Sequence, residues 1–590
     1  MHTFRVWAPL PKKVEVQVGK KRFPMNRDEN GWWTAEVNLV GTPRCGVQTA
    51  QRAVPIDYGF ILDGKGPFPD PRSPWQPDGV HGLSRLVDHN DFKWTDKHFQ
   101  ALPLASAIIY ELHVGTFTSE GTFESAIKKL EHLVKLGVTH VEMMPVAEFS
   151  GDHNWGYDGV DLFAPHHAYG GLLGLKKIVN ACHARGFAVI LDVVYNHLGP
   201  AGNFLGKFAP YFTQRYAPVW GEAINFDGAD SDEVRRFFCD NALMWLRDYH
   251  FDGLRLDAVH AIFDSSAIHI LEELKIEVEK LSAQLGRHFV LIPESDLNDP
   301  RLLWSREHGG YQLDAQWSDD FHHALHTVLT GEKNGYYADF GSLADLAKTF
   351  KDVFVYDGKF SKYRRCSHGR PAGNLNGSRF LGYLQNHDQI GNRAQGERSS
   401  HLMSLGKLKI GAAIVLTSPF VPMLFQGEEW GASTPFQFFT DHREPKLAKA
   451  IGIGRCKEFV AFGWKPEEIP DPQSRGTFLR SKLNWREILR APHAELLAWH
   501  RKLIQLRHST TLLTDGRLDC IQTRFDELNR WLTISRGSIC IVCNINSHSQ
   551  HVPLPAGKHR LLLASEPQIK MAEGHANLPP ESVAIFATRD

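Results

Sequence analysis

No excess of charge of either sign runs through this sequence, because 66 lysines and arginines balance 67 aspartates and glutamates. The formal net charge of −1 provides no field that would attract nucleic acid or an acidic membrane surface, so neither is expected as a partner. Long apolar runs are also missing, and no segment is expected to span a bilayer. The opening residues, MHTFRVWAPL, lack the basic stretch and apolar core of a signal peptide.

Cysteine is sparse, with eight in the chain, and Cys540 and Cys543 form the one close pair. Their surroundings, SICIVCNI, are typical of a strand, where positions three apart point to opposite faces. The pair is therefore not expected to close on one metal. No other group of residues has the spacing of metal ligands, so we expect neither a metal nor a cofactor. Scattered cysteines without a leader favour a reduced, cytoplasmic protein.

The chain is rich in aromatic side chains, which make up 11% of it and suit stacking on flat ligands such as sugars. Its 590 residues predict two to four domains. In residues 1–102, FRVWAP, KVEVQV and GWWTAEVNLV (31–40) alternate apolar and polar positions, which predicts an N-terminal β-sandwich. Residues 64–82 are rich in proline and glycine, and we expect a loop there.

Residues 103–510 alternate short apolar runs with amphipathic helical stretches. One helix is expected over 122–137, with Thr122 as its N-cap and Gly137 as its end. Eight β-α units of continuous apolar character predict a (β/α)8 TIM barrel, and an α/β fold class. The expected strands lie in 106–114, 138–146, 186–197, 251–259, 288–295, 311–318, 379–388 and 420–429.

A helix around 493–507 precedes a return to short alternating strands. These are RWLTIS, SICIVCNI, HRLLLAS and SVAIFAT. They predict a C-terminal β-sandwich over residues 511–590.

The segment FDGLRLDAVH (251–260) places Arg255 and Asp257 on the same face of a strand. A structural ion pair and a catalytic carboxylate tuned by an arginine both explain this pattern. Three more expected strands also end in polar side chains: DVVYNH (192–197), PESD (293–296) and QNHDQ (385–389). Barrel enzymes place their chemistry at the C-terminal ends of the strands, so four such ends favour catalysis.

These motifs, in this order, resemble the α-amylase family of glycoside hydrolases (family 13). The resemblance implies a retaining double displacement, with Asp257 as nucleophile, Glu294 as general acid/base and Asp388 as stabiliser of the transition state. Arg255 favours an ionised Asp257, while burial and two nearby aspartates are expected to raise the pKa of Glu294. Pro293 departs from the family, where alanine often precedes the glutamate.

The same resemblance implies further residues that bind the sugar. Tyr157 fits a stacking platform, and the segment DDFHH (319–323) is expected on a loop at the catalytic side. The rings of GEEWGASTPFQFFTDH (427–442) suit sugar stacking or simple packing. The full set of substrate-binding candidates is Tyr157, His197, Arg255, His260, Asp319, Asp320, His322, His323, His387, Gln389 and Asn392.

Other stretches, among them WGYDGVDLFAPHHAYGG (155–171), resemble the members of this family that release trehalose. That resemblance implies cleavage of the α-1,4 bond next to the terminal trehalose of maltooligosyltrehalose. It also implies a role in trehalose biosynthesis, after a maltooligosyltrehalose synthase. Two alternatives stay open: an α-glucan branching enzyme with the same three carboxylates, and an inactive barrel kept for glycan or partner binding.

Overall fold

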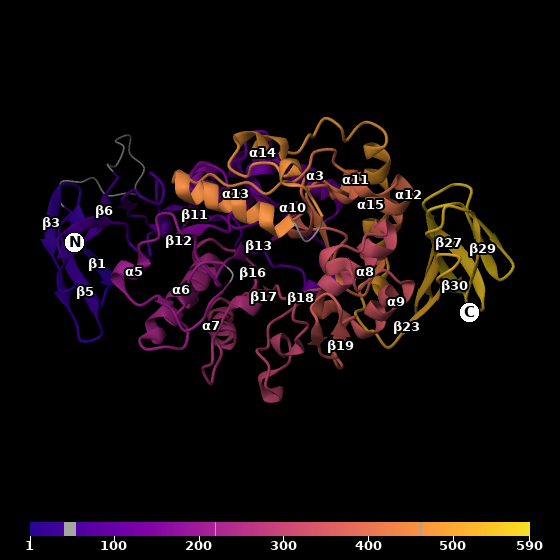
Figure 1. Cartoon of the computed structure of the whole chain (residues 1–590), viewed down its shortest axis with the longest axis horizontal. Coiled ribbons are helices and arrows are strands. Elements are labelled where there is room, and N and C mark those ends of the chain that lie inside the picture. Colours follow the sequence, from indigo (N-terminus) through magenta and orange to yellow (C-terminus); the bar gives the residue numbers. More distant parts are fainter. Residues whose placement is uncertain (40–54, 219, 460–462, 590) are drawn as a thin grey trace.

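The computed structural model describes residues 1–39, 55–218, 220–459 and 463–589. Figure 1 shows three parts in a row along the long axis, with the N-terminal sheets at one end and the C-terminal sheets at the other. The central part is a barrel of parallel strands surrounded by helices. This arrangement confirms the predicted barrel with flanking β-domains. The boundaries predicted at 102/103 and 510/511 stay a prediction.

Two antiparallel sheets form the N-terminal part and share one apolar core. One sheet contains β1 (His2–Trp7), β5 (Trp32–Val37) and β4 (Asn26–Arg27). The other contains β3 (Lys21–Pro24), β2 (Val14–Val18), β6 (Asp57–Leu62), β7 (Lys65–Phe68) and β8 (Ser84–Arg85).

The N-terminal strands follow the predicted alternation, since Phe4 and Val6 of β1 are buried while Thr3 and Arg5 are not. The prediction of a loop throughout 64–82 was wrong, because its first residues pair with β6 as strand β7. The proline and glycine content of the segment did not indicate this strand, which is short and lies next to a turn. Val40, the last residue of a predicted strand segment, lies outside the described residues.

Eight strands form the ladder of the barrel, in the order β17-β16-β13-β10-β9-β22-β21-β18. All neighbours along it pair in parallel, and the end strands β17 and β18 contact each other. Each strand lies inside a predicted segment. In chain order they are β9 (Ile109–Leu112), β10 (His140–Met143), β13 (Ala188–Val193), β16 (Gly253–Leu256), β17 (Val290–Pro293), β18 (Gln316–Trp317), β21 (Phe380–Gly382) and β22 (Val421–Phe425).

The helices pack outside the barrel with their apolar faces inward. The single helix predicted over 122–137 is two, α2 (Phe123–Ile127) and α3 (Leu130–Leu136), although Thr122 caps the first and Gly137 ends the second as predicted. None of the helices in the described ranges has the length and apolarity that a bilayer-crossing segment needs. Other long helices are α4 (Gly171–His183), α6 (Ser231–Asp248), α7 (Ile270–Leu285), α8 (Asp319–Thr330), α12 (Leu405–Thr417), α13 (Pro445–Phe459) and α15 (His493–Ser509).

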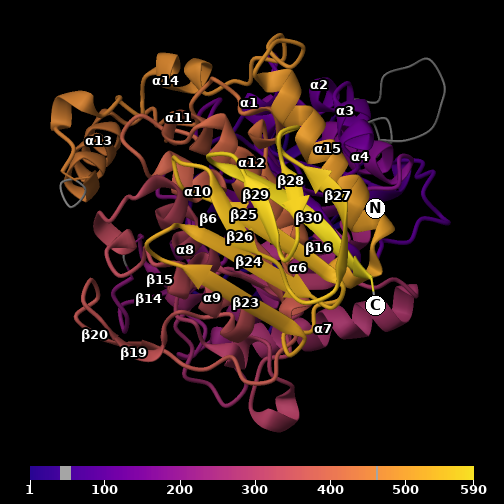
Figure 2. The same cartoon turned by 90° about the vertical axis from the view of Figure 1, so that its right-hand side faces the viewer.

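Two further antiparallel sheets form the C-terminal part (Figure 2). Cys540 and Cys543 lie on opposite faces of one strand and belong to different apolar clusters, so they cannot approach each other. The seven described cysteines are all free. The larger sheet contains β23 (Ile521–Asp526), β24 (Trp531–Arg536), β25 (Ile539–Asn544), β30 (Ser582–Arg589) and β27 (Lys558–Ala564). The smaller contains β26 (Gln550–Pro553), β29 (His575–Leu578) and β28 (Lys570–Ala572).

One buried arginine joins the C-terminal sheets to the barrel. Arg536, in β24, donates to the carbonyls of Thr417 and Ser418 where α12 ends. It also reaches the carbonyls of Leu513 and Asp515 in the connecting segment. The last carbonyls of a helix have no partner within it, and the guanidinium satisfies them together with Arg507, which also donates to the Ser418 carbonyl.

Arg536→Met should therefore lower the free energy of unfolding by about 3 kcal/mol, because several buried carbonyls lose a charged donor. Scanning calorimetry of the full chain measures the change. Arg517→Met, which removes an exposed arginine paired with Asp515, serves as the control and should leave the unfolding temperature unchanged. Equal melting curves for Arg536→Met and the parent chain would contradict the proposed joint.

Candidate active site

Two carboxylates lie beside each other where adjacent barrel strands end. Asp257 follows β16 and Glu294 follows β17, and the two strands pair in parallel with Leu256 opposite Pro293. The backbone amide of Ala258 donates to Glu294 Oε2 at 2.6 Å, which fixes the glutamate beside the end of β16. Both side chains reach solvent, with exposed fractions of 13% for Asp257 and 16% for Glu294. The two acids therefore share one accessible place at the barrel mouth.

A buried arginine joins these acids to a third. Arg255 Nη1 donates to both oxygens of Asp192 at 2.9 Å and to Asp257 Oδ1 at 2.6 Å. Its Nη2 lies 3.6 Å from Glu294 Oε2. The guanidinium also lies over the Trp317 ring, 4.3 Å from the centroid. Arg255, in β16, and Asp257, just after it, thus face the same side, as the alternation along a strand predicts.

The pKa values of the two carboxylates move in opposite directions. Burial by itself raises the pKa of Asp257, but the Arg255 cation and neighbouring donors outweigh burial and lower that pKa below its usual value. Burial is also the largest effect on Glu294, and with the charges of Asp319 and Asp388 it raises the Glu294 pKa well above normal despite Arg255. At neutral pH the surroundings therefore favour an ionised Asp257 and a protonated Glu294.

The third expected carboxylate lies in the first turn of a short helix. Asp388 belongs to α10 (His387–Gly391), whose N-cap side chain accepts the backbone amides of Asp388 and Gln389. Asp388 Oδ1 accepts a hydrogen bond from Asn392 Nδ2 at 2.7 Å. The Asp388 side chain is exposed, and its charge acts on Glu294. This carboxylate is therefore near the other two and open to a ligand.

A chain of hydrogen bonds runs below the acids. Glu111, in β9, accepts from His387 Nδ1 and from the His387 backbone amide. His387 Nε2 lies 2.7 Å from the Tyr157 hydroxyl, which donates to Asp192 Oδ2 at 2.7 Å. Burial would lower the pKa of His387, but Glu111 outweighs it and raises that pKa. Sequence reasoning missed Glu111, although a carboxylate inside the apolar run SAIIYELHV was a usable signal.

Asn196 and His197 continue from the end of β13 toward the same acids. Asn196 Nδ2 donates to Asp257 Oδ2 at 2.8 Å, and its Oδ1 faces His197 Nδ1. The rings of His197 and His260 lie 6.0 and 6.4 Å from the Trp220 ring. That indole is 42% exposed, and sequence reasoning missed it. No local pattern distinguishes Trp220, since its place beside His197 and His260 comes from a long connection.

The prediction of a loop for DDFHH was wrong, because these residues begin helix α8 immediately after the two-residue strand β18. Asp320 Oδ2 accepts the backbone amides of Val355 and Tyr356, and Asp320 lines a small pocket together with Asp319. His322 is buried against the ring of Tyr383, which follows β21, and His323 stacks on Tyr336. All three side chains make contacts within the protein, and they are positioned by a helix and not by a loop.

Asp319 is the member of this segment that faces the carboxylates. Its Oδ1 accepts from the Tyr383 hydroxyl at 2.6 Å and from Gln389 Nε2 at 3.3 Å. Burial raises the pKa of Asp319 to about 7, with nearby acids adding to the effect. Asp319 therefore gains its negative charge only near neutral pH, at a position where that charge acts on Glu294.

The aromatic rings that follow β22 mostly pack inside the protein. Trp430, Phe436 and Phe439 are completely buried. Trp430 Nε1 donates to Glu487, and Phe436 stacks on Trp155. Of the two explanations for these rings, the structure therefore favours packing of a long segment.

Comparisons with known proteins agree with this geometry. Residues 87–212 match the family described as the alpha amylase catalytic domain, and residues 516–585 match a domain of unknown function, DUF3459. The chain is 50% identical to the malto-oligosyltrehalose trehalohydrolase of Arthrobacter ramosus, over 94% of each chain. It is 46% identical to that of Mycobacterium tuberculosis (strain ATCC 25618 / H37Rv), over 99% of each chain.

Solved structures extend the similarity. A putative alpha amylase from Salmonella typhimurium superposes with a TM-score of 0.89 at 36% identity, covering 99% of this chain and 97% of its own. A pullulanase from Paenibacillus barengoltzii shares the fold, with a TM-score of 0.72 at 18% identity over 100% and 94% of the two chains.

A branching enzyme matches a smaller part of the sequence. The 1,4-alpha-glucan branching enzyme GlgB of Shewanella baltica is 38% identical, but over 44% of this chain and 37% of its own.

Removing the arginine should show how strongly the site depends on it. Arg255→Met leaves the carboxylates of Asp192 and Asp257 without their cation and should lower the free energy of unfolding by about 3 to 5 kcal/mol. Adding Asp192→Asn removes one of these uncompensated charges, so the double variant should be more stable than Arg255→Met alone. Calorimetry of the wild type, both single variants and the double variant measures the coupling. A double variant as unstable as the sum of the two single changes would refute this account.

Proposed function

Because the chain belongs to the malto-oligosyltrehalose trehalohydrolases of the α-amylase family, we propose that it releases trehalose from maltooligosyltrehalose by hydrolysing the adjacent α-1,4-glucosidic bond. The observation that carries the proposal is the pairing of an acid with a lowered pKa and an acid with a raised pKa at one barrel mouth. Relatives with this name match the whole chain, whereas the branching enzyme matches less than half of it.

The chemistry needs one ionised and one protonated carboxyl group. Asp257 attacks the anomeric carbon of the glucosyl unit, while Glu294 donates its proton to the glycosidic oxygen of the departing trehalose. The products of this step are a glucosyl ester on Asp257, an ionised Glu294 and free trehalose. Glu294 then takes a proton from water, which attacks the ester, releases the shortened maltooligosaccharide and restores both acids.

A cation shared by the two acids supports retention. Retaining pairs stand about 5 to 5.5 Å apart, closer than the pairs of inverting enzymes. One guanidinium reaches both acids here, at 2.6 Å from Asp257 and 3.6 Å from Glu294, which favours the closer arrangement. Asp388, with its exposed side chain, is suited to hydrogen-bond hydroxyls of the distorted ring.

The substrate-binding candidates fall into groups according to the side chains that surround them. Tyr157, His387 and Arg255 are tied together through Asp192 and suit the wall of the subsite that holds the cleaved glucosyl unit. The exposed Trp220 indole near His197 suits sugar stacking. His260, Asp319, Gln389 and Asn392 complete the set of side chains proposed to contact the substrate, and Asp320, His322 and His323 support it from inside.

The proposal extends to the cellular setting. Free cysteines suit a reducing compartment, and we assign the enzyme to the cytoplasm. Its substrate carries a terminal trehalose, so an enzyme that forms this unit, a maltooligosyltrehalose synthase, must act before it.

Incubation with maltotriosyltrehalose tests the activity. We expect trehalose and maltotriose as products, separated by thin-layer chromatography. Asp257→Ala and Glu294→Gln should each lower kcat by several orders of magnitude, because each removes a group that acts in the transition state.

Longer branched glucans without free trehalose would instead indicate a branching enzyme. No product at all would indicate an inactive barrel. Unchanged rates in both variants would reject the assignment of the two acids.

Asp319 offers a test through pH. The activity should be lost at high pH as Glu294 loses its proton, and lost at low pH as Asp257 gains one. Asp319 is charged only above about pH 7, so it raises the Glu294 pKa on the alkaline side alone. Asp319→Asn should move the alkaline limb of kcat/KM to lower pH by about one unit and leave the acidic limb in place.

Asp299→Asn serves as the control, because this aspartate follows β17, as Glu294 does, but pairs with Arg301. Its profile should match the wild type. An alkaline limb that stays in place in Asp319→Asn would show that Asp319 does not act on Glu294.

A further inference from the structure

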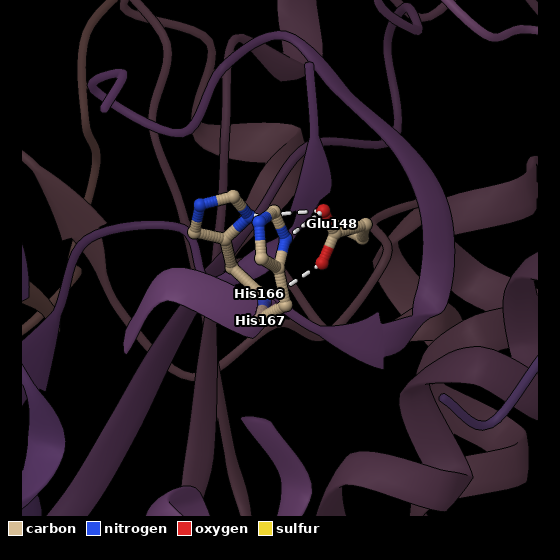
Figure 3. Close-up of side chains that lie close together, drawn as sticks. All are labelled: Glu148, His166 and His167. Atoms are coloured by element: carbon tan, nitrogen blue, oxygen red, sulfur yellow. Dashed lines mark hydrogen bonds and ion pairs between the residues drawn. The ribbon is translucent and has the colours of Figure 1, made fainter. Parts of the chain in front are cut away.

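A second cluster of titratable side chains lies in the ribbon between β10 and α4. Glu148 belongs to β11 (Ala147–Phe149), and His166 and His167 follow the antiparallel strand β12 (Gly159–Pro165). One ligand atom from each of the three lies within 4.8 Å of the others. Figure 3 shows both imidazole rings on the same side of the Glu148 carboxylate. Sequence reasoning found no metal-ligand spacing here, because the strand pairing brings the residues together.

The carboxylate presents one oxygen to both rings. Glu148 Oε2 accepts the backbone amide of His167 at 2.8 Å. This bond orients Glu148 Oε1 toward His167 Nδ1 at 2.7 Å and His166 Nδ1 at 3.2 Å. The Glu148 side chain is fully buried.

His166 is the unusual member of the cluster. Its side chain is fully buried, its Nδ1 pairs only with Glu148 Oε1 at 3.2 Å without hydrogen-bond geometry, and its Nε2 has no hydrogen-bond partner among the described residues. Stacking on Phe149, at 3.6 Å between centroids, holds the ring in this orientation. A buried polar group without a partner is rare in native proteins, and a bound ion or water is a common reason for one.

We propose that Glu148, His166 and His167 bind a divalent transition-metal cation of the Zn²⁺ type. Two imidazole nitrogens and one carboxylate oxygen suit such ions, whereas Ca²⁺ and Mg²⁺ prefer oxygen ligands alone. Ligand atoms around a tetrahedral zinc ion stand roughly 3.3 Å apart, given bonds of about 2.0 to 2.1 Å. The 3.2 Å separation of His166 and Glu148 already matches, and His167 needs to retreat by about half an ångström.

The outer surroundings also fit a metal site. His167 Nε2, the nitrogen that points away from the cluster, lies 3.7 Å from Asp152 Oδ1. A carboxylate behind a metal-bound imidazole is a common arrangement, which fixes the ring and strengthens the ligand. The His167 side chain is 23% exposed, so a cation and one water molecule can reach the cluster from solvent.

A metal here would join the two ends of the segment 149–165, which carries Tyr157 toward Asp192 and His387. We therefore expect a positioning and stabilising effect on that segment. The site does not depend on the proposed hydrolysis, since its ligands make none of the contacts that the reaction needs.

The test uses the full chain after treatment with a chelator, with Zn²⁺ as the probe in titration calorimetry and Co²⁺ as a spectroscopic reporter. We expect one equivalent of saturable Zn²⁺ binding, a rise in the unfolding temperature with Zn²⁺, and the visible absorption of tetrahedral Co²⁺. Glu148→Gln, His166→Gln and His167→Gln should each weaken binding at least about tenfold. His167→Gln keeps the buried side chains intact and guards against a folding defect.

His183→Gln is the matched control. His183 is also a buried histidine between carboxylates, but its two nitrogens face Asp96 and Asp252 on opposite sides of the ring, so it cannot chelate one ion. This variant should bind Zn²⁺ like the wild type. Failure of the wild type to bind one equivalent, or binding that all three ligand variants leave unchanged, would overturn the proposal.

Discussion

The barrel mouth depends on one buried cation, the guanidinium of Arg255. It neutralises charge from Asp192 and Asp257, and a second nitrogen lies within reach of Glu294. Several carboxylates so close together would otherwise be expensive to bury, and burial without a partner would protonate them. The arginine therefore does more than stabilise the fold. Its cation outweighs burial at Asp257, whereas at Glu294 burial and the neighbouring carboxylates prevail and keep the proton on.

Local sequence patterns predicted much of this structure. The eight barrel strands lie inside the predicted segments because a buried parallel strand is a short apolar run, and this property is local. The contact of Arg255 with Asp257 follows from the same alternation along one strand. For DDFHH, a helical signal was also present, since Phe321, Ala324, Leu325 and Val328 are buried at helical spacing. The two aspartates at the start of the segment instead suggested a loop, so the helical signal was not recognised.

Other features depend on contacts between distant residues, which no local pattern records. Glu111 meets His387 across 276 positions of sequence, and Glu148 meets His167 through the pairing of two short strands. Trp220 reaches the histidines of the mouth through the long connection between β13 and α6. In each case the residue type alone leaves the role open, because charged and aromatic side chains are common on any surface.

A raised pKa does not by itself mark a catalytic acid, and the barrel contains its own counterexample. Glu142, in β10, also has a pKa well above normal, because it is buried next to Glu111 and Asp192. It is only 1% exposed, and neither of its oxygens has a hydrogen-bond partner among the described residues, so a substrate at the mouth has no access to its proton. Glu294 has the same electrostatic cause for its shift but stands at the open end of its strand. Charge repulsion and burial keep both Glu142 and Glu294 protonated. Only Glu294 has access to the mouth, and this makes it suitable as the catalytic acid.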